Sequence, residues 1–218
     1  MRKDFLLEVL VQELPYKFIP SAIAQLESSF EKLFKENGLA YGKINVYATP
    51  RRLAVLVDDL ALCQETVSKD VKGPILNIAK TESGEFSPAA IGFAKKNNVE
   101  LSDLYEKDNY IWAKIEIKGN STVDILKQNI ESLILKLQGA HFMRWAYNSE
   151  KFSRPIENVV ALLGNEIVDL KILEKTATNT TIGHRYSINK VVKIDEPKNY
   201  IELLKTANVL NYAENSLK

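Results

Sequence analysis

The sequence Phe142-Met-Arg-Trp145, followed by Phe152-Ser-Arg-Pro-Ile156 and Ala161-Leu-Leu-Gly164, is the stretch around which the chain is organised. It brings arginines, large aromatic side chains and a proline close together, and it ends in an apolar run that is typical of a strand. Arginine is scarce, because only six of the 29 basic residues are arginines. Five of these six lie in short motifs: Thr49-Pro-Arg-Arg52, Met143-Arg-Trp145, Ser153-Arg-Pro155 and Gly183-His-Arg-Tyr186. Since a guanidinium group binds carboxylates and phosphates as a planar fork, the pattern predicts either contacts with such a partner or buried ion pairs that fix loops.

Composition indicates an ordinary globular protein with one large or two small domains. The chain has 218 residues, of which 45% are hydrophobic and 26% are charged, and its net charge is +1. A free-standing nucleic-acid-binding domain would carry a larger positive excess, so we expect any nucleic acid to contact a local patch. The single cysteine, Cys63, excludes an intrachain disulfide and indicates a reducing compartment, so we expect a cytoplasmic location.

The apolar run Phe5–Val11 is interrupted by Glu8 and is not followed by a small-residue cleavage site, so it predicts a core strand rather than a signal peptide. No apolar run approaches the roughly 18 residues that a membrane helix needs.

Residues 1–64 are predicted to form a β-α-β-β unit. A strand over residues 4–11 precedes a helix whose apolar positions recur every three or four residues and which stops at Asn37-Gly38. Strands over residues 44–48 and 53–57 follow. They flank Pro50, and the hairpin that they form would place Arg51 and Arg52 at its tip, where their side chains reach solvent or a partner.

The rest of the chain is predicted to contain a second unit of similar order. Residues 65–108 are expected to be a loop-rich excursion with a short helix that starts at Ser87-Pro88. Residues 109–195 are expected to form the second β-α-β-β-like unit, which carries the later arginine motifs. Residues 196–218 would begin a following helical region. The expected fold class is α/β (α+β), with a mixed sheet built from the two units and amphipathic helices packed on it.

The second unit is predicted from four elements. They are a strand over 110–117, a helix from about 121 to Gly139, and strands over 159–163 and 167–172. Further on, residues 191–194 are a strand candidate and residues 197–210 a helix candidate.

Motifs of self-sufficient catalysis are missing from the sequence. There is no phosphate-binding glycine loop, no Gly-x-Ser-x-Gly turn and no acid–base pair that sequence alone would reveal. His141, His184 and Cys63 are scattered and do not have the spacing of a zinc site. The sequence therefore predicts a binding or scaffolding part, without catalytic or metal-ligating residues.

A set of short motifs in a fixed order carries a family resemblance that covers nearly the whole chain. The motifs are Leu7-Glu-Val9, Glu13-Leu-Pro15, Tyr47-Ala-Thr-Pro-Arg-Arg-Leu-Ala-Val55, Lys72-Gly-Pro74, Ala90-Ile-Gly-Phe-Ala94, Met143-Arg-Trp145, Phe152-Ser-Arg-Pro-Ile156, Val160-Ala-Leu-Leu-Gly164 and Gly183-His-Arg-Tyr186. Together they resemble the N-terminal part of the beta subunit of bacterial glycyl-tRNA synthetase, the heterotetrameric type.

The resemblance implies a division of labour between two kinds of subunit. In that family the alpha subunit activates glycine with ATP and Mg²⁺. The beta subunit binds tRNA(Gly) and the alpha subunit within a tetramer of two alpha and two beta chains. The resemblance implies that this chain binds no cofactor itself and corresponds to part of a longer subunit. Two alternatives stay open: a tRNA-editing deacylase module, in which His184 with Thr180 or Thr181 lines a small pocket, and a protein-interaction module without RNA contact.

The basic and aromatic motifs supply the candidate RNA contacts. Phosphate contacts add salt-dependent affinity, and aromatic side chains stack on unpaired bases. Core packing is the alternative for Trp145 and Trp112. The candidate RNA-binding residues are Arg51, Arg52, Arg144, Arg154, His184 and Arg185, and the candidate stacking residues are Trp145 and Tyr186.

Overall fold

The computed structural model describes residues 1–64, 67–79, 86–117, 119–139, 142–144, 151–184, 191–209 and 212–213. Trp145, Arg185 and Tyr186 therefore lie outside the described residues. The helices are α1 (Phe18–Glu36), α2 (Leu76–Ala79), α3 (Pro88–Asn97), α4 (Thr122–Leu135) and α5 (Tyr200–Thr206), with short 3-10 turns at Leu101–Asp103 and Pro197–Asn199. The strands are β1 (Arg2–Val11), β2 (Ile44–Thr49), β3 (Arg52–Ala61), β4 (Val67–Ile75), β5 (Leu104–Lys107), β6 (Tyr110–Ile117), β7 (Met143–Arg144), β8 (Lys151–Phe152), β9 (Ile156–Leu163), β10 (Glu166–Ile167), β11 (Lys171–Ile172), β12 (Lys175–Thr176), β13 (Thr180–Ile182), β14 (Val191–Lys193) and β15 (Tyr212–Ala213).

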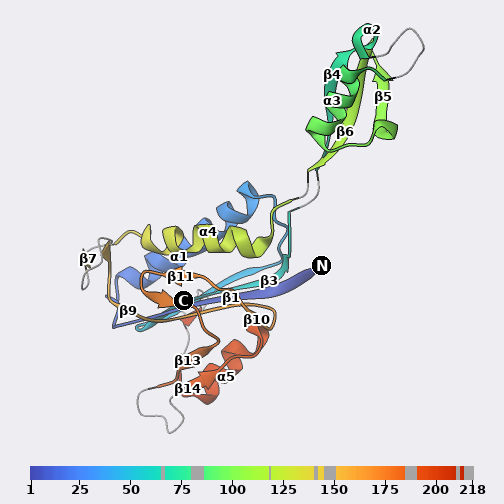
Figure 1. Cartoon of the computed structure of the whole chain (residues 1–218). Coiled ribbons are helices and arrows are strands. Elements are labelled where there is room, and N and C mark those ends of the chain that lie inside the picture. Colours follow the sequence, from blue (N-terminus) through green and yellow to red (C-terminus); the bar gives the residue numbers. More distant parts are fainter. Residues whose placement is uncertain are drawn as a thin grey trace. The chain divides into compact units, whose positions relative to one another are not determined.

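The chain divides into two compact units. The first, called the sheet unit here, contains Met1–Gln64 and Asn120–Lys218; the second, called the inserted unit, contains Glu65–Gly119. Figure 1 shows the helices and strands of both.

The sheet unit is built on a six-stranded sheet in the order β10-β9-β1-β3-β2-β15. β1 lies inside this sheet and pairs antiparallel with β3 and with β9. Apart from Glu8, its residues 5–11 are apolar on both faces, because alternate side chains enter different cores. Phe5, Leu7 and Val9 belong to the core that includes α1 and α4, whereas Leu6 belongs to the core that includes α5. Helices therefore cover both faces of the sheet, as Figure 1 shows.

Helix α1 forms where the apolar spacing predicts it. All five apolar positions of the expected stripe are buried: Ile19, Ile23, Leu26, Phe30 and Leu33. The helix ends at the expected place, where the side chain of Asn37 donates to the Leu33 carbonyl and Gly38 adopts a φ of +59°. Because only glycine adopts this left-handed conformation at low cost, it suits a helix end.

The inserted unit has its own sheet and core. Its strands lie in the order β4-β6-β5, and its core contains Ala79, Ala90 and Ile111. The expected helix start at Ser87-Pro88 is confirmed, because the Ser87 hydroxyl accepts from the backbone N–H groups of Ala89 and Ala90.

The α/β fold class is confirmed, but the second β-α-β-β unit is not formed as expected. The strand over 110–117 exists as β6, yet it pairs with β4 in the inserted unit, so α4 and β9 belong to a different sheet. β4 and α2 also occupy residues that were expected to be loop, and the inserted unit extends to Gly119 rather than to residue 108. Alternation of side chains predicts a strand but does not identify its pairing partner.

Three smaller expectations about the fold were wrong. Residues 167–172 form two short strands, β10 and β11, that lie in different sheets, and the helix expected over 197–210 is limited to a 3-10 turn and α5. Every ladder between the described strands is antiparallel, and the parallel pairing found among the described residues is an isolated bridge between Val160 and Thr178, so the expected mixed sheet is not formed by these strands. Within the described residues, no helix has the length and apolar character that crossing a membrane would require.

Candidate functional site

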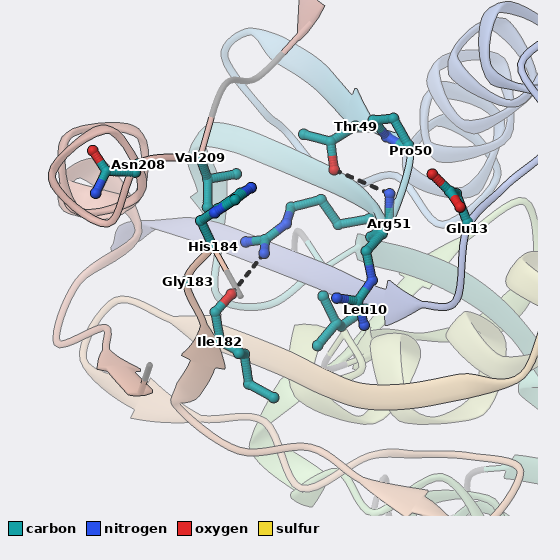
Figure 2. A pocket seen from close by; sticks show the side chains of 11 residues that line it. Leu10, Glu13, Thr49, Pro50, Arg51, Ile182, Gly183, His184, Asn208 and Val209 are labelled. Carbon is teal, nitrogen blue, oxygen red and sulfur yellow. Dashed lines mark hydrogen bonds between the residues drawn. The ribbon is translucent and has the colours of Figure 1, made fainter. Parts of the chain in front are cut away.

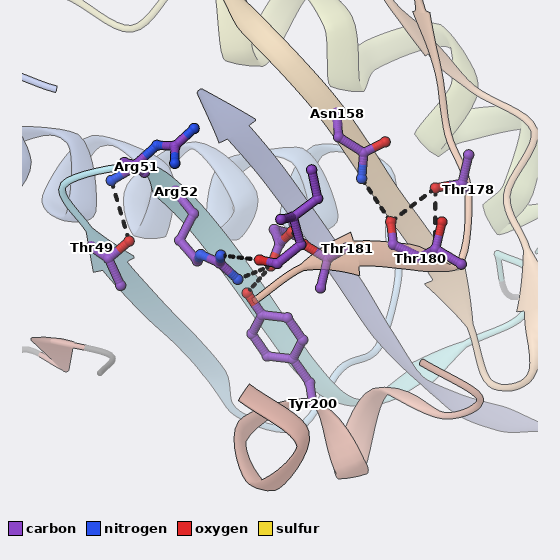
Figure 3. Close-up of polar contacts among 10 residues, drawn as sticks. Thr49, Arg51, Arg52, Asn158, Thr178, Thr180, Thr181 and Tyr200 are labelled. Atoms are coloured by element: carbon purple, nitrogen blue, oxygen red, sulfur yellow. Dashed lines mark hydrogen bonds and ion pairs between the residues drawn. The ribbon is translucent and has the colours of Figure 1, made fainter. Parts of the chain in front are cut away.

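A fully buried carboxylate lies at the centre of the sheet unit. Glu8 on β1 is 0% exposed, and its Oε2 atom accepts from Nη1 of Arg52 at 3.1 Å. Tyr200 at the start of α5 donates its hydroxyl to the same oxygen, and Thr181 on β13 donates its hydroxyl to Oε1. Figure 3 shows these polar contacts, with Arg52, Thr181 and Tyr200 converging from three elements. A buried charge is tolerated only when it is paired and hydrogen-bonded, and both oxygens of Glu8 meet that condition.

The position of Glu8 explains why Arg52 is buried. Arg52 on β3 lies opposite Leu10 of β1, and Ala54 lies opposite Glu8, so the two charged side chains share the face that α5 covers. Nη2 of Arg52 also donates to the Ile182 carbonyl at 2.7 Å. The residue is only 4% exposed, so of the alternatives that the sequence left open for the arginines, the buried ion pair is the one that applies to Arg52.

Tyr200 is a donor in this cluster under all ordinary conditions. Burial raises the pKa of its hydroxyl well above 10.0, and the negative charge of Glu8 raises the pKa further. The phenol therefore stays protonated and keeps its hydrogen bond to the carboxylate. The cluster ties β13 and α5 to the two central strands.

Beside this cluster lies a cavity of about 360 Å³, which we call the Arg52 cavity. It is formed by the end of β1, the turn between β2 and β3, the end of β13 and the segment after α5. Figure 2 shows the side chains that line it. They are Leu10, Glu13, Thr49, Pro50, Arg51, Arg52, Ile182, Gly183, His184, Asn208 and Val209.

The turn between β2 and β3 is held firmly at the edge of the cavity. The carbonyl of Arg51 accepts from Val11 N–H at 2.8 Å, and the carbonyl of Pro50 accepts from Leu14 N–H at 2.6 Å. The Arg51 side chain is 38% exposed, and its Nη2 pairs with Glu157 at 2.8 Å. The structure thus brings Arg51, Arg52 and His184 together, as three of the predicted RNA-binding residues.

Arg154 holds loops together. Its Nε donates to the Glu13 carbonyl at 2.9 Å and its Nη1 donates to the Ser153 carbonyl at 2.8 Å. Since Gln12 N–H also donates to the Pro155 carbonyl, Arg154 reinforces the contact between the segment after β1 and the segment before β9.

Arg144 lies in a different, more basic place. It is exposed on β7, directly opposite Lys151 of β8, and both residues line a shallow hollow of about 820 Å³ together with Lys136. The remaining described lining residues are Leu135, Leu137, Gln138, Gly139 and Phe142, none of which is acidic. Like charges opposite each other in a ladder are destabilising, so this arrangement favours an anion as a partner. We call Lys136, Arg144 and Lys151 the basic hollow.

The sequence did not identify Glu8, Lys136 or Lys151 as site residues. For Glu8 a signal existed, because a carboxylate inside an apolar strand must find a cation when the strand is buried. For the two lysines no such signal existed, since they are two of many exposed lysines in the chain.

The geometry offers little for an editing reaction or a metal. Of His184, Thr180 and Thr181, only His184 lines the Arg52 cavity, and the Thr181 hydroxyl is committed to Glu8. Among the described residues, no group of three or more His, Cys, Asp or Glu side chains is arranged to hold a metal ion.

Comparisons with known proteins give a consistent family. The family model described as glycyl-tRNA synthetase beta subunit matches residues 5–216. The glycine–tRNA ligase beta subunit of Shouchella clausii is 39% identical over 218 residues, which is 98% of this chain and 31% of that protein. The same subunit of Listeria monocytogenes is 36% identical, again over 98% of this chain and 31% of that protein. The one from Trichodesmium erythraeum is 39% identical over 94% of this chain and 30% of that protein.

The chain thus spans about a third of the length of these relatives, and it matches their N-terminal part. Since the family model covers nearly every residue, the match does not depend on one motif. The chain belongs to the glycyl-tRNA synthetase beta subunit family.

Proposed function

We propose that this chain is the part of a glycine–tRNA ligase beta subunit that contributes tRNA binding and contact with the alpha subunit. In this proposal the complete ligase contains two alpha and two beta subunits and attaches glycine to tRNA(Gly). The alpha subunit uses ATP and Mg²⁺, and this chain supplies no catalytic residue. Family membership and the names of the relatives support the proposal.

The observation that carries the RNA-binding part is the basic hollow. Within the described residues, the side chains of Lys136, Arg144 and Lys151 make no ion pair, although the chain has almost as many acidic as basic residues. Three such cations around one open surface form the kind of local patch that an RNA backbone contacts. Among the described lining residues there is no carboxylate, so bringing these cations together costs stability, which a bound phosphate backbone would offset.

The other candidate arginines have structural partners. Arg51, Arg52 and Arg154 bind Glu157, Glu8 and two carbonyl groups, so each has a role that needs no RNA. Arg144 is therefore the candidate among the described arginines whose role an RNA phosphate explains best.

The test removes the three positively charged side chains of the basic hollow in the full-length subunit, which is assembled with its alpha partner. The triple variant Lys136→Ala, Arg144→Ala, Lys151→Ala is compared with wild type for tRNA affinity at several salt concentrations. Because each phosphate contact releases counterions, we expect the slope of log affinity against log salt to shrink by about 2.

A matched control removes three exposed lysines elsewhere in the sheet unit: Lys32, Lys35 and Lys171. This control should leave the slope near that of wild type. If both triple variants change the slope equally, or neither changes it, the basic hollow does not bind RNA and a protein-interaction role becomes the better explanation.

A further inference from the structure

We propose that the Arg52 cavity binds one unpaired nucleotide of the tRNA, with the base inside the cavity. This inference rests on the proposed function and names a second contact that works differently from the basic hollow. The basic hollow would hold the RNA backbone by charge, whereas the cavity would hold a single base by shape and hydrogen bonds.

The size and walls of the cavity suit a planar base. Its volume of about 360 Å³ lies in the range of small-molecule sites and exceeds what a bare ion fills. Leu10, Pro50, Ile182 and Val209 give it apolar surface, and Arg51 and Arg52 add guanidinium-bearing side chains to the lining. Unpaired bases in RNA are recognised by such a combination of stacking surface and hydrogen-bonding edges.

The charge balance favours a neutral base over a free phosphate. Arg52 is already paired with Glu8, and Arg51 is already paired with Glu157. Glu13 adds a further carboxylate to the lining, so the positive charge of the two arginines is offset. A multiply charged anion would gain little here, while a base that both donates and accepts hydrogen bonds finds matching groups.

Two of the polar groups in the lining, those of Thr49 and Arg52, are held in fixed positions by hydrogen bonds. The Thr49 hydroxyl accepts from the Arg51 backbone N–H, and its own O–H remains a donor at the cavity wall. Glu13 and His184, which come from different parts of the chain, lie on opposite sides of Thr49 in Figure 2. Because Arg52 is fixed by Glu8 and Ile182, the floor of the cavity is preorganised.

The experiment narrows the cavity and measures both the affinity for tRNA and the chemical reactivity of individual tRNA bases. Val209→Phe narrows the cavity, and Val191→Phe makes the same change at a position that is 68% exposed on β14 and does not line it. His184→Ala removes an exposed side chain of the lining without changing a core. Each variant is prepared in the full-length subunit with its alpha partner. Its affinity for tRNA is measured, and base-specific chemical modification of the bound tRNA is mapped.

We expect Val209→Phe to weaken tRNA binding about tenfold, the size of one lost base contact, without changing the salt slope. His184→Ala should weaken it in the same direction. One unpaired base, protected in wild type and in Val191→Phe, should become reactive in both cavity variants. Melting temperatures close to that of wild type would show that the cavity variants fold.

The inference fails if all base protections and affinities match those of Val191→Phe. In that case the proposed function is still supported if the triple variant of the basic hollow reduces the slope of log affinity against log salt. Free adenosine monophosphate is tested in parallel by equilibrium dialysis. If it binds wild type but not Val209→Phe while tRNA binding is unchanged, the cavity takes a free nucleotide and the assignment to tRNA is overturned.

Discussion

At the scale of single residues, one buried carboxylate in the central sheet needs polar partners from several other elements. Glu8 is the only charged residue between Phe5 and Val11, and the strand that carries it is covered on both faces. Burying it requires Arg52, Tyr200 and Thr181, which arrive from β3, α5 and β13. The structural ion pair thus borders the Arg52 cavity, because the Arg52 side chain also lines it.

The two neighbouring arginines should differ strongly in their effect on stability. Arg52→Ala leaves Glu8 buried with an unpaired charge, which costs about 3–5 kcal/mol. Arg51→Ala breaks a partly exposed pair with Glu157, for which about 1 kcal/mol or less is expected. Urea-induced unfolding of the two variants, followed by circular dichroism, measures both values.

A charge-removing control identifies the cause of the larger effect. In the double variant Glu8→Leu with Arg52→Met, neither charge is left unpaired, so most of the stability lost in Arg52→Ala should return. Equal losses for Arg51→Ala and Arg52→Ala would show that Glu8 does not depend on its ion pair.

The sequence predicted that the arginines have carboxylate or phosphate partners, but it did not show which arginines pair with residues of the chain itself. Arg51 and Arg52 are adjacent, so their side chains leave the strand end in different directions, and only one meets Glu8. That difference depends on the register between β1 and β3, which places Arg52 opposite Leu10. Register follows from the assembled sheet and cannot be read from the motif alone.

At the scale of elements, local signals predicted helices and strands better than their partners. The stripe of α1 and the Ser87 cap of α3 are properties of neighbouring residues, and both were confirmed. The pairing of β6 with β4 depends on contacts in the assembled inserted unit, so the second unit was assigned to the wrong residues. The sequence of β4 did not clearly predict a strand, because Lys69, Asp70 and Lys72 interrupt its apolar residues.

Two glycines of the inserted unit should respond to alanine in opposite directions. A Cβ atom on Gly73 of β4 would lie 2.8 Å from the Phe93 ring and 2.9 Å from the Ile111 carbonyl oxygen, so Gly73→Ala should cost about 1–3 kcal/mol. On Gly92 of α3 it would meet nothing within 4 Å, so Gly92→Ala should stabilise the helix by about 0.5–1 kcal/mol.

Hydrogen exchange of the β6 amides reports these changes inside the whole chain, because it measures the local opening of the inserted unit. Exchange should become faster in Gly73→Ala and slower in Gly92→Ala. A change in the same direction for both would mean that the close packing of Gly73 against Phe93 does not support the unit.

At the scale of the whole molecule, the two units have separate cores. Every residue of the two large cores lies in the sheet unit, and every residue of the small core lies in the inserted unit. The chain leaves and re-enters the sheet unit at neighbouring points. Gln64 N–H donates to the Asn120 carbonyl at 3.1 Å, and Asn120 N–H donates to the Gln64 side chain at 2.8 Å.

The sheet unit should therefore fold without the inserted unit. We expect a chain in which Asn-Gly replaces residues 65–119 to keep the antiparallel sheet, because a two-residue turn closes neighbouring antiparallel strands and no core residue is lost. The Thr122 hydroxyl and N–H, which donate to the carbonyls of Ala61 and Leu62, would continue to join the two ends. Cooperative thermal unfolding and low binding of a hydrophobic dye should both be retained.

Removal of Ile156–Ile167 serves as the contrasting deletion, since it takes β9 from beside β1 and should abolish the cooperative transition. If the shortened chain without residues 65–119 also unfolds without cooperativity, the sheet unit depends on the inserted unit for its stability, despite the separation of their cores.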